Sequence, residues 1–245
     1  MSVLYIEGLS KRYKHHTALE PFSLQAKKGE CIVLCGGNGA GKSTLLHMLA
    51  GISSPSAGTV RILEIDLKKQ RNEYVRHIGY MPDAFYAQEM MTVREFLHFY
   101  AALRKCPANQ VKEALQLIGL HDKERERVGH LSKGMKQRLL FGQALLGKPD
   151  VLLLDEPTNG LDPYWMNQFI KIIKAVKNEG TIVVFSTHMM DVAAEVGDFV
   201  IFLEEGKILH ILQNPKENVE HFTWELLQLY RKKEEKLSNS FPVFI

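Results

Sequence analysis

The stretch LCGGNGAGKST, residues 34–44, is the part of the sequence that determines the fold. The apolar run CIVLC (Cys31–Cys35) leads into it and has the length of a buried strand. Residues 43–50 follow as a predicted helix, which Gly51 is placed to end. A glycine-rich loop between a strand and a helix predicts an α/β fold that binds phosphate groups at this loop.

The spacing Gly36-x-x-x-x-Gly41-Lys42-Ser43 matches a P-loop, in which glycines let backbone N–H groups turn inward around phosphates. We expect Lys42 to reach the β- and γ-phosphates of a nucleoside triphosphate and the Ser43 hydroxyl to reach Mg²⁺. A chance match in a glycine-rich loop is the alternative, and the flanking strand and helix argue against it. The expected nucleotide contacts are Gly36, Gly37, Asn38, Gly39, Ala40, Gly41, Lys42, Ser43 and Thr44.

Two further apolar runs are each followed by polar residues that are candidates for the nucleotide site. Val151–Leu154 predicts a buried strand that releases Asp155 at its carboxyl end, where ligands bind in open α/β sheets. We expect Asp155 in the magnesium shell and Glu156 to polarise the attacking water, the alternative being a solvated acidic turn. His188 follows the predicted strand at residues 181–185, so we expect it at the same edge, donating to a γ-phosphate or orienting the base. A lone histidine with a structural role is the alternative.

The rest of the chain alternates short β-branched runs with longer helical stretches, which predicts a parallel sheet with helices on its faces. Asp162-Pro163 is typical of a helix start, with an N-cap followed by proline at the first helical position. Residues 199–209, FVIFLEEGKIL, predict two strands around a turn at residues 205–206. Residues 220–245 are expected to form a C-terminal helix and tail.

The middle of the chain has a different pattern. Thr92 and Glu95 form the spacing of a capping box before a helical stretch. Residues 109–118 predict a second helix, and Ser132 is placed to cap a third. Three helices are too long for a simple crossover between parallel strands, so residues 84–145 are expected to form an inserted helical subdomain.

The composition sets limits on partners and location. The chain has 245 residues, 45% hydrophobic and 24% charged, with a net charge of +3 that is too weak to indicate nucleic-acid binding. No apolar run approaches the roughly 18–20 residues that span a bilayer, and the N-terminus lacks a secretory signal. Cys31, Cys35 and Cys106 have no metal-binding spacing and are expected to be reduced thiols. We therefore expect a cytoplasmic protein.

The segment LSKGM, residues 131–135, is similar to the signature of the ABC transporter ATPases. GGNGAGKST, VLLLDEP, NGLD and His188 occur in the order of that family, so the resemblance covers most of the chain. It implies one ABC ATPase domain over residues 1–245, with a RecA-like P-loop NTPase core and a mostly parallel sheet. It also implies a small N-terminal antiparallel β part and the inserted helical subdomain. ATP energy would then close and open a pair of such subunits.

The resemblance also implies roles for individual residues. Tyr13 lies where the family places an aromatic ring that stacks on adenine, the alternative being a surface strand aromatic. Ser132 and the backbone at Gly134 would contact the γ-phosphate bound to the opposite subunit, as a helix N-terminus aimed at an anion. Asp162, in NGLD, would lie at the subunit boundary. The implied ligands are ATP and Mg²⁺.

The chain departs from the family pattern at two places. Lys133 and Met135 stand where the signature usually has glycine and glutamine, while Ser132 and Gly134 are kept. In IGYMPDAFY, Asp83 stands where the family usually has a glutamine that touches Mg²⁺. With an acid at this position, the chain resembles family branches such as exporter and copper-enzyme maturation subunits. We expect Asp83 to contact Mg²⁺ directly or through water, because a carboxylate beside a phosphate would be repelled.

The predicted function is the ATP-hydrolysing subunit of an ABC transporter, a homodimer under separate transmembrane permease chains at the cytoplasmic face of the membrane. The alternative is a soluble ABC-type ATPase acting in translation or chromosome maintenance. Tandem nucleotide domains or long coiled-coil insertions mark those relatives, and this chain has neither. A P-loop kinase, the third possibility, does not explain LSKGM. No nucleic-acid partner is expected.

Overall fold

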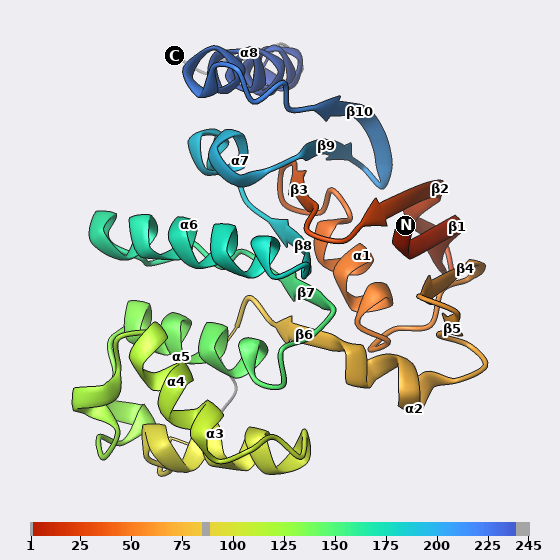
Figure 1. The fold of residues 1–245 in the computed structure, drawn as a ribbon. Coiled ribbons are helices and arrows are strands. Elements are labelled where there is room, and N and C mark those ends of the chain that lie inside the picture. Colours follow the sequence, from red (N-terminus) through yellow and green to blue (C-terminus); the bar gives the residue numbers. More distant parts are fainter. Residues whose placement is uncertain (1, 85–88, 239–245) are drawn as a thin grey trace.

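The structure, a computed structural model, describes residues 2–84 and 89–238, so the end of the predicted C-terminal tail lies outside the described residues. The larger sheet has six strands in the order β10-β9-β3-β8-β7-β6, and only the β9–β10 pair is antiparallel (Figure 1). The expected α/β fold with a mostly parallel sheet is confirmed. Its strands are β3 (Cys31–Cys35), β6 (Ile78–Met81), β7 (Val151–Leu154), β8 (Ile182–Ser186), β9 (Phe199–Glu204) and β10 (Lys207–Gln213).

The predicted strands of this sheet agree closely with the structure. β3 and β7 have the predicted bounds, and β8 begins and ends one residue later than predicted, because Ile182 is the residue that pairs with Val151. All three strands are buried along their whole length, as expected where helices cover both faces of a parallel sheet. The turn between β9 and β10 has Glu205 and Gly206 at positive φ, which confirms the predicted hairpin.

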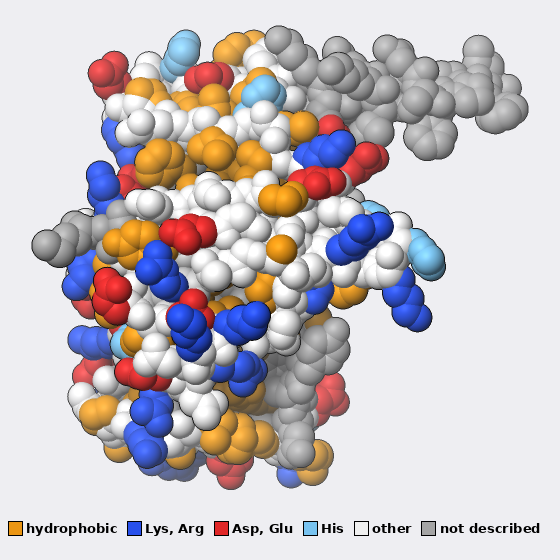
Figure 2. All heavy atoms as spheres, turned by 90° about the vertical axis from the view of Figure 1, so that its right-hand side faces the viewer, with side chains coloured by type: hydrophobic (Ala, Val, Ile, Leu, Met, Phe, Trp, Pro, Cys, Tyr) orange, Lys and Arg blue, Asp and Glu red, His pale blue; other side chains and the backbone are white. Residues whose placement is uncertain are grey.

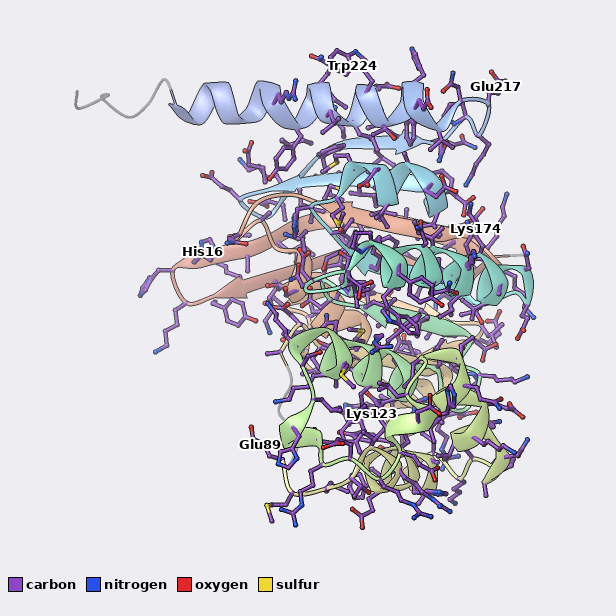
Figure 3. The ribbon with its side chains drawn as sticks, turned by 90° about the vertical axis from the view of Figure 1, so that its left-hand side faces the viewer. His16, Glu89, Lys123, Lys174, Glu217 and Trp224 are labelled. Atoms are coloured by element: carbon purple, nitrogen blue, oxygen red, sulfur yellow. The ribbon has the colours of Figure 1, made fainter. Side chains whose placement is uncertain are left out.

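A second, antiparallel sheet has the strand order β2-β1-β4-β5 and confirms the expected N-terminal β part. Its long hairpin ends where Tyr13 pairs with His16. Figure 3 shows His16 at the end of this hairpin, away from the centre of the molecule. The strands are β1 (Ser2–Tyr13), β2 (His16–Lys27), β4 (Ala57–Ile62) and β5 (Ile65–Asp66).

The helices surround the larger sheet, with α3, α4 and α5 grouped at one end of the molecule and α8 at the other (Figure 1). Short 3₁₀ turns occur at Val75–His77, His121–Lys123 and Val128–His130. The helices are α1 (Lys42–Leu49), α2 (Arg71–Tyr74), α3 (Val93–Leu103), α4 (Asn109–Leu117), α5 (Lys133–Leu145), α6 (Pro163–Asn178), α7 (Met190–Val196) and α8 (Val219–Ser238).

Three helices begin at the residues that the sequence predicts. Thr92 and Glu95 form a complete capping box at α3. The Ser132 hydroxyl accepts a hydrogen bond from the Met135 backbone N–H at 3.3 Å and so caps α5. Asp162 caps α6, accepting a hydrogen bond from a backbone N–H in the first turn at 2.8 Å. Each cap supplies an acceptor to an N–H group that has no partner within its helix.

Strand β3 belongs to two apolar cores because its side chains alternate between the faces of the sheet. Cys31, Val33 and Cys35 pack in one core with α3 to α6, whereas Ile32 and Leu34 pack in the other with α1 and the smaller sheet. Burial raises the pKa of Cys31 and of Cys35 to about 12, so both remain neutral thiols. The cysteines are free, in agreement with the expected reduced state.

The described helices include none that is long and apolar enough to cross a membrane. On the face shown in Figure 2, basic and acidic side chains are interspersed. The parallel strands end at a common edge, which we call the carboxyl edge. The chain leaves β3 for the P-loop, β6 for Asp83, β7 for Asp155 and β8 for His188 at this edge.

Candidate nucleotide site

The P-loop has a backbone that only glycine fits at two positions. Gly36 and Gly41 have φ values of +154° and +104°. A Cβ on Gly36 would lie 2.4 Å from the Leu203 carbonyl oxygen, and one on Gly41 would lie 2.6 Å from the Ala18 carbonyl oxygen. The loop therefore lies directly against β9 and β2 at these two glycines.

Lys42 is the first residue of α1, and its ammonium group is turned back into the loop. Its Nζ donates hydrogen bonds to the carbonyl oxygens of Gly36 at 2.8 Å and Gly37 at 3.3 Å. The same Nζ lies 3.6 Å from Glu156 Oε1. The lysine is thus held beside the space that the loop encloses, within reach of an acidic partner.

The Glu156 carboxylate contacts two other residues of the site. Besides Lys42, its carboxylate contacts His188, whose Nδ1 lies 3.2 Å from Oε2. The His188 side chain is 57% exposed, whereas that of Glu156 is 15% exposed. The structure therefore brings together Lys42, Glu156 and His188, the three residues predicted to act in catalysis. The half-exposed His188 contacts the base through Nδ1 and has a second ring nitrogen that could bond a phosphate or a water.

Ser186 connects the two acidic residues and was not predicted. Its hydroxyl donates to Asp155 Oδ1 at 2.7 Å and accepts from the Glu156 backbone N–H at 2.7 Å. Asp155 is only 2% exposed, so this bond satisfies a buried carboxylate. The signal in the sequence is the position of Ser186 directly after the apolar run at residues 181–185 and two residues before His188.

The Glu156 backbone is strained. Its φ of +47° is unusual for a residue with a side chain, and such conformations cost about 1–3 kcal/mol. Gln137 of α5, another residue that was not predicted, donates from Nε2 to the Glu156 carbonyl oxygen at 3.0 Å. Side chains from β8 and α5 therefore hold both backbone polar groups of Glu156.

The residues at the carboxyl edge fit a magnesium ion that is bound together with a nucleotide. The Tyr80 hydroxyl is buried and has no hydrogen-bond partner among the described residues. Its pKa is raised by burial, by Asp155 and by Asp83, so both carboxylates lie near it. The described residues contain no group of three or more His, Cys, Asp or Glu that would hold a metal alone. Mg²⁺ keeps several waters and phosphate oxygens, so two carboxylates and the Ser43 hydroxyl suffice.

Asp83 makes a contact that the sequence did not indicate. The Asn159 side-chain amide donates to Asp83 Oδ1 at 3.3 Å. Asn159 belongs to NGLD, the loop between β7 and α6, so Asp83 links the end of β6 to that loop. Asp83 is exposed, in contrast to Asp155.

The remaining predicted residues lie apart from this cluster. Tyr13 is 50% exposed at the end of the hairpin, where Lys11 Nζ lies 4.9 Å from the centre of its ring. Asp162 caps α6, as described above. In the described part of the chain, no hydrogen bond or ion pair joins residues 131–135, here called the signature segment, to the P-loop. Within one chain, Ser132 and Gly134 therefore have no bonded contact with Lys42 among the described residues, although the start of α5 packs against the loop after β7.

Comparison with known proteins agrees with this architecture. Residues 19–159 match the protein-family model described as ABC transporter. The uncharacterized ABC transporter ATP-binding protein YxlF of Bacillus subtilis is 42% identical over 213 residues, which cover 84% of this chain and 69% of YxlF. The bacitracin transport ATP-binding protein BcrA of Bacillus licheniformis is 34% identical over 212 residues, which cover 85% of this chain and 69% of BcrA.

Solved structures show the same fold. The dimeric structure of MJ0796, a bacterial ABC transporter cassette, has a TM-score of 0.80 and 25% identity, covering 86% of this chain and 98% of that one. The same cassette in a dimeric post-hydrolysis state with ADP and Pi has a TM-score of 0.77 and 26% identity, with the same coverage. This chain therefore belongs to the ABC transporter family. It is an ATP-binding, ATP-hydrolysing subunit, and the comparisons give no support to a role in translation or chromosome maintenance.

Proposed function

We propose that two copies of this chain close around two ATP molecules, each bound between the P-loop of one copy and the signature segment of the other. The observation that carries this proposal is that, among the described residues of one chain, no hydrogen bond or ion pair joins the signature segment to Lys42 or to the rest of the P-loop. Lys136 lies in the first turn of α5, and its Nζ is 4.0 Å from Glu89 Oε1, so Glu89 marks the position of the signature segment. Figure 3 shows Glu89 on the same side of the molecule as His16, which marks the hairpin that carries Tyr13. A second copy facing that side would meet both halves of the site. The dimer of MJ0796 supports this arrangement.

In each site, Glu156 acts as the general base that takes a proton from the attacking water. Lys42 is placed to leave its contact with Glu156 for the β- and γ-phosphates, which frees the carboxylate to bond the water. His188 then orients the base or donates to the γ-phosphate. The Lys42–Glu156 and His188–Glu156 contacts support this assignment because they join all three groups within 3.6 Å.

Ser43, Asp155 and Asp83 would hold Mg²⁺, which supplies positive charge to the β- and γ-phosphate oxygens. The buried Tyr80 hydroxyl, which has no hydrogen-bond partner among the described residues and whose pKa both carboxylates raise, supports a hydrated ion there. The P-loop residues 36–44 bind the phosphates through backbone N–H groups. Tyr13 stacks on adenine, and its exposed position at the hairpin end leaves a ring face accessible.

The outer parts of the shared site come from the signature segment and the NGLD loop. Ser132 and the Gly134 backbone contact the γ-phosphate on the partner, through the N-terminus of α5. Asp162 lies at the boundary between the two copies. Residues 1–245 then work as one ABC domain, in which residues 84–145 act as a helical subdomain and residues 220–245 as a C-terminal appendage.

The dimer would drive transport through separate membrane permease chains at the cytoplasmic face of the membrane. Exposed apolar side chains on the helical segment, at Met90, Phe99 and Leu103, support a permease contact there. Asp83 in place of the usual glutamine supports an exporter or copper-enzyme maturation branch, and the name of BcrA refers to bacitracin transport. Crosslinking from residues 82–91 in membranes would identify the permease.

Mixed dimers test the shared site. Lys42→Ala and Ser132→Arg homodimers should each have two broken sites, whereas a mixed dimer puts both defects into one site and leaves the other intact. Random exchange of an equal mixture gives about half mixed dimers. Mixing two inactive preparations should restore ATP-dependent dimer closure, measured by crosslinking across the dimer. Mixed dimers that form but never close would contradict the proposal.

A further inference from the structure

Helix α5 contacts the segment after β7 at two levels. Near its start, Gly134 lies so close to that segment that an added Cβ would be 2.6 Å from the Gly160 carbonyl oxygen. One turn later, Gln137 Nε2 donates to the Glu156 carbonyl oxygen at 3.0 Å. Gln137 is only 5% exposed, so water does not compete freely for this bond. The beginning of α5 and residues 156–160 are therefore packed as one unit.

The contact reaches the backbone of the base itself. Glu156 has a positive φ, and its N–H is already bonded to Ser186. Its carbonyl oxygen accepts hydrogen bonds from Gln137 Nε2 at 3.0 Å and from the Asn159 backbone N–H of the same loop at 3.2 Å, so Gln137 is the contact that ties this carbonyl to α5. A shift of α5 would therefore act on this peptide group through Gln137, and on the carboxylate attached to the same Cα.

We propose that Gln137 is a positioning residue that couples the signature segment to Glu156 of the same chain, so that each ATP influences the base in the other site. This proposal rests on the shared site proposed above. Ser132 and Gly134 face the nucleotide of the partner's P-loop, whereas Glu156 serves the nucleotide of its own P-loop. Gln137 lies five positions after Ser132, about 7.5 Å along the helix axis, so a small movement of the α5 N-terminus reaches it directly.

Gln137 would make the same hydrogen bond if its role were only to stabilise the fold by pairing a buried carbonyl oxygen. The test therefore has to separate an effect on coupling from an effect on stability. Gln137→Met keeps the length of the side chain and removes the donor. Gln143→Met is the matched control, because Gln143 is a buried glutamine of the same helix with no bond to Glu156. For both variants, the melting temperature, KM, kcat and the Hill coefficient for ATP should be measured.

We expect Gln137→Met to lower kcat by about tenfold or more, as loss of a supporting hydrogen bond does at other sites, with KM nearly unchanged. The Hill coefficient should fall toward one. Gln143→Met should leave kcat and the Hill coefficient unchanged, even if its melting temperature falls as far. Equal effects of the two variants, or an unchanged Hill coefficient in Gln137→Met, would overturn the proposal.

Gln137→Glu provides a second readout that depends on pH. A protonated carboxyl can donate to the Glu156 carbonyl oxygen, and a carboxylate cannot. Burial raises the pKa of such a carboxyl, so protonation should occur within the working range of the enzyme. The ratio of its kcat to that of Gln137→Met should rise as the pH falls. A ratio that stays constant with pH would contradict a donor role for this position.

The experiments distinguish an error in the proposed coupling through Gln137 from an error in the proposed shared site. If wild-type protein gives a Hill coefficient of one and the Lys42→Ala and Ser132→Arg mixture never closes, the shared site itself is wrong and the coupling falls with it. If wild type is cooperative and the mixture closes, but Gln137→Met stays as cooperative as wild type, only the coupling is wrong.

Discussion

The P-loop and the acidic end of β7 contact the same proposed nucleotide but are built in different ways. The P-loop is held by its own backbone, since Gly36 and Gly41 lie against the carbonyl oxygens of neighbouring strands. At the end of β7, side chains from two other elements, Ser186 and Gln137, hold Glu156. The P-loop, which we call the phosphate-binding half, therefore depends on glycines that no larger residue can replace. The end of β7, which we call the catalytic half, depends on hydrogen-bonding side chains that are distant in sequence. The variants below separate these two dependences.

The largest expected effect is that of Glu156→Gln. Loss of a positioned general base typically lowers the rate by about 10²–10⁴-fold. The amide keeps the size of the side chain, so ATP binding should persist and the nucleotide-bound dimer should accumulate. Single-turnover hydrolysis and size-exclusion chromatography with ATP measure the two effects. Near-normal turnover in the purified variant would remove Glu156 from the role of base.

Gly41→Ala tests the backbone-held half. Its Cβ would meet the Ala18 carbonyl oxygen at 2.6 Å, whereas a Cβ on Gly39 would meet nothing within 4 Å. Both glycines have positive φ, so Gly39→Ala controls for the conformational strain of about 1–3 kcal/mol. We expect Gly41→Ala to weaken binding of a fluorescent ATP analogue much more than Gly39→Ala does. Equal losses would mean that the close contact with β2 is unimportant.

Ser186→Ala tests the half that side chains hold. It removes the donor to Asp155 and the acceptor for the Glu156 N–H, and leaving such buried groups unpaired costs about 1–3 kcal/mol. Turnover should fall by about 10–100-fold, as is typical when a supporting hydrogen bond to a metal site is lost. Urea unfolding and the ATPase rate measure the two losses. A stable variant with full activity would contradict this account of the acidic edge.

The smallest effect is expected for Asp83→Asn, at the exposed side of the acidic half. If Asp83 helps to hold Mg²⁺, loss of its charge should raise the magnesium concentration needed for half-maximal activity. Asn159→Ala is the matched control, since it removes the bond to Asp83 without changing the charge. Magnesium titrations of the ATPase rate of both variants measure this concentration. If it is unchanged in Asp83→Asn, Asp83 does not help to hold Mg²⁺ and is assigned to the contact with the membrane partner.

The difference between local and long-range contacts also explains which features could be predicted from the sequence. The P-loop, the strand that precedes it and the caps at Thr92, Ser132 and Asp162 follow from local patterns, and the structure has them as expected. Ser186 and Gln137 were missed because they contact residues 155 and 156 from 31 and 19 positions away. No local pattern specifies which buried donor faces which carbonyl. The register between β7 and β8 decides the first of these contacts, and the packing of α5 decides the second.

The left-handed backbone of Glu156 has a consequence for how this position can vary over evolution. Glycine, asparagine and aspartate adopt a φ near +47° more readily than other residues, and β-branched residues adopt it least. Selection on folding therefore restricts position 156 even in a copy that has lost hydrolysis. A duplicated gene whose product no longer turns over ATP should acquire asparagine, aspartate or glycine there, and should avoid valine, isoleucine and threonine. The shape of the chain, and not only its chemistry, limits how this family can lose an active site.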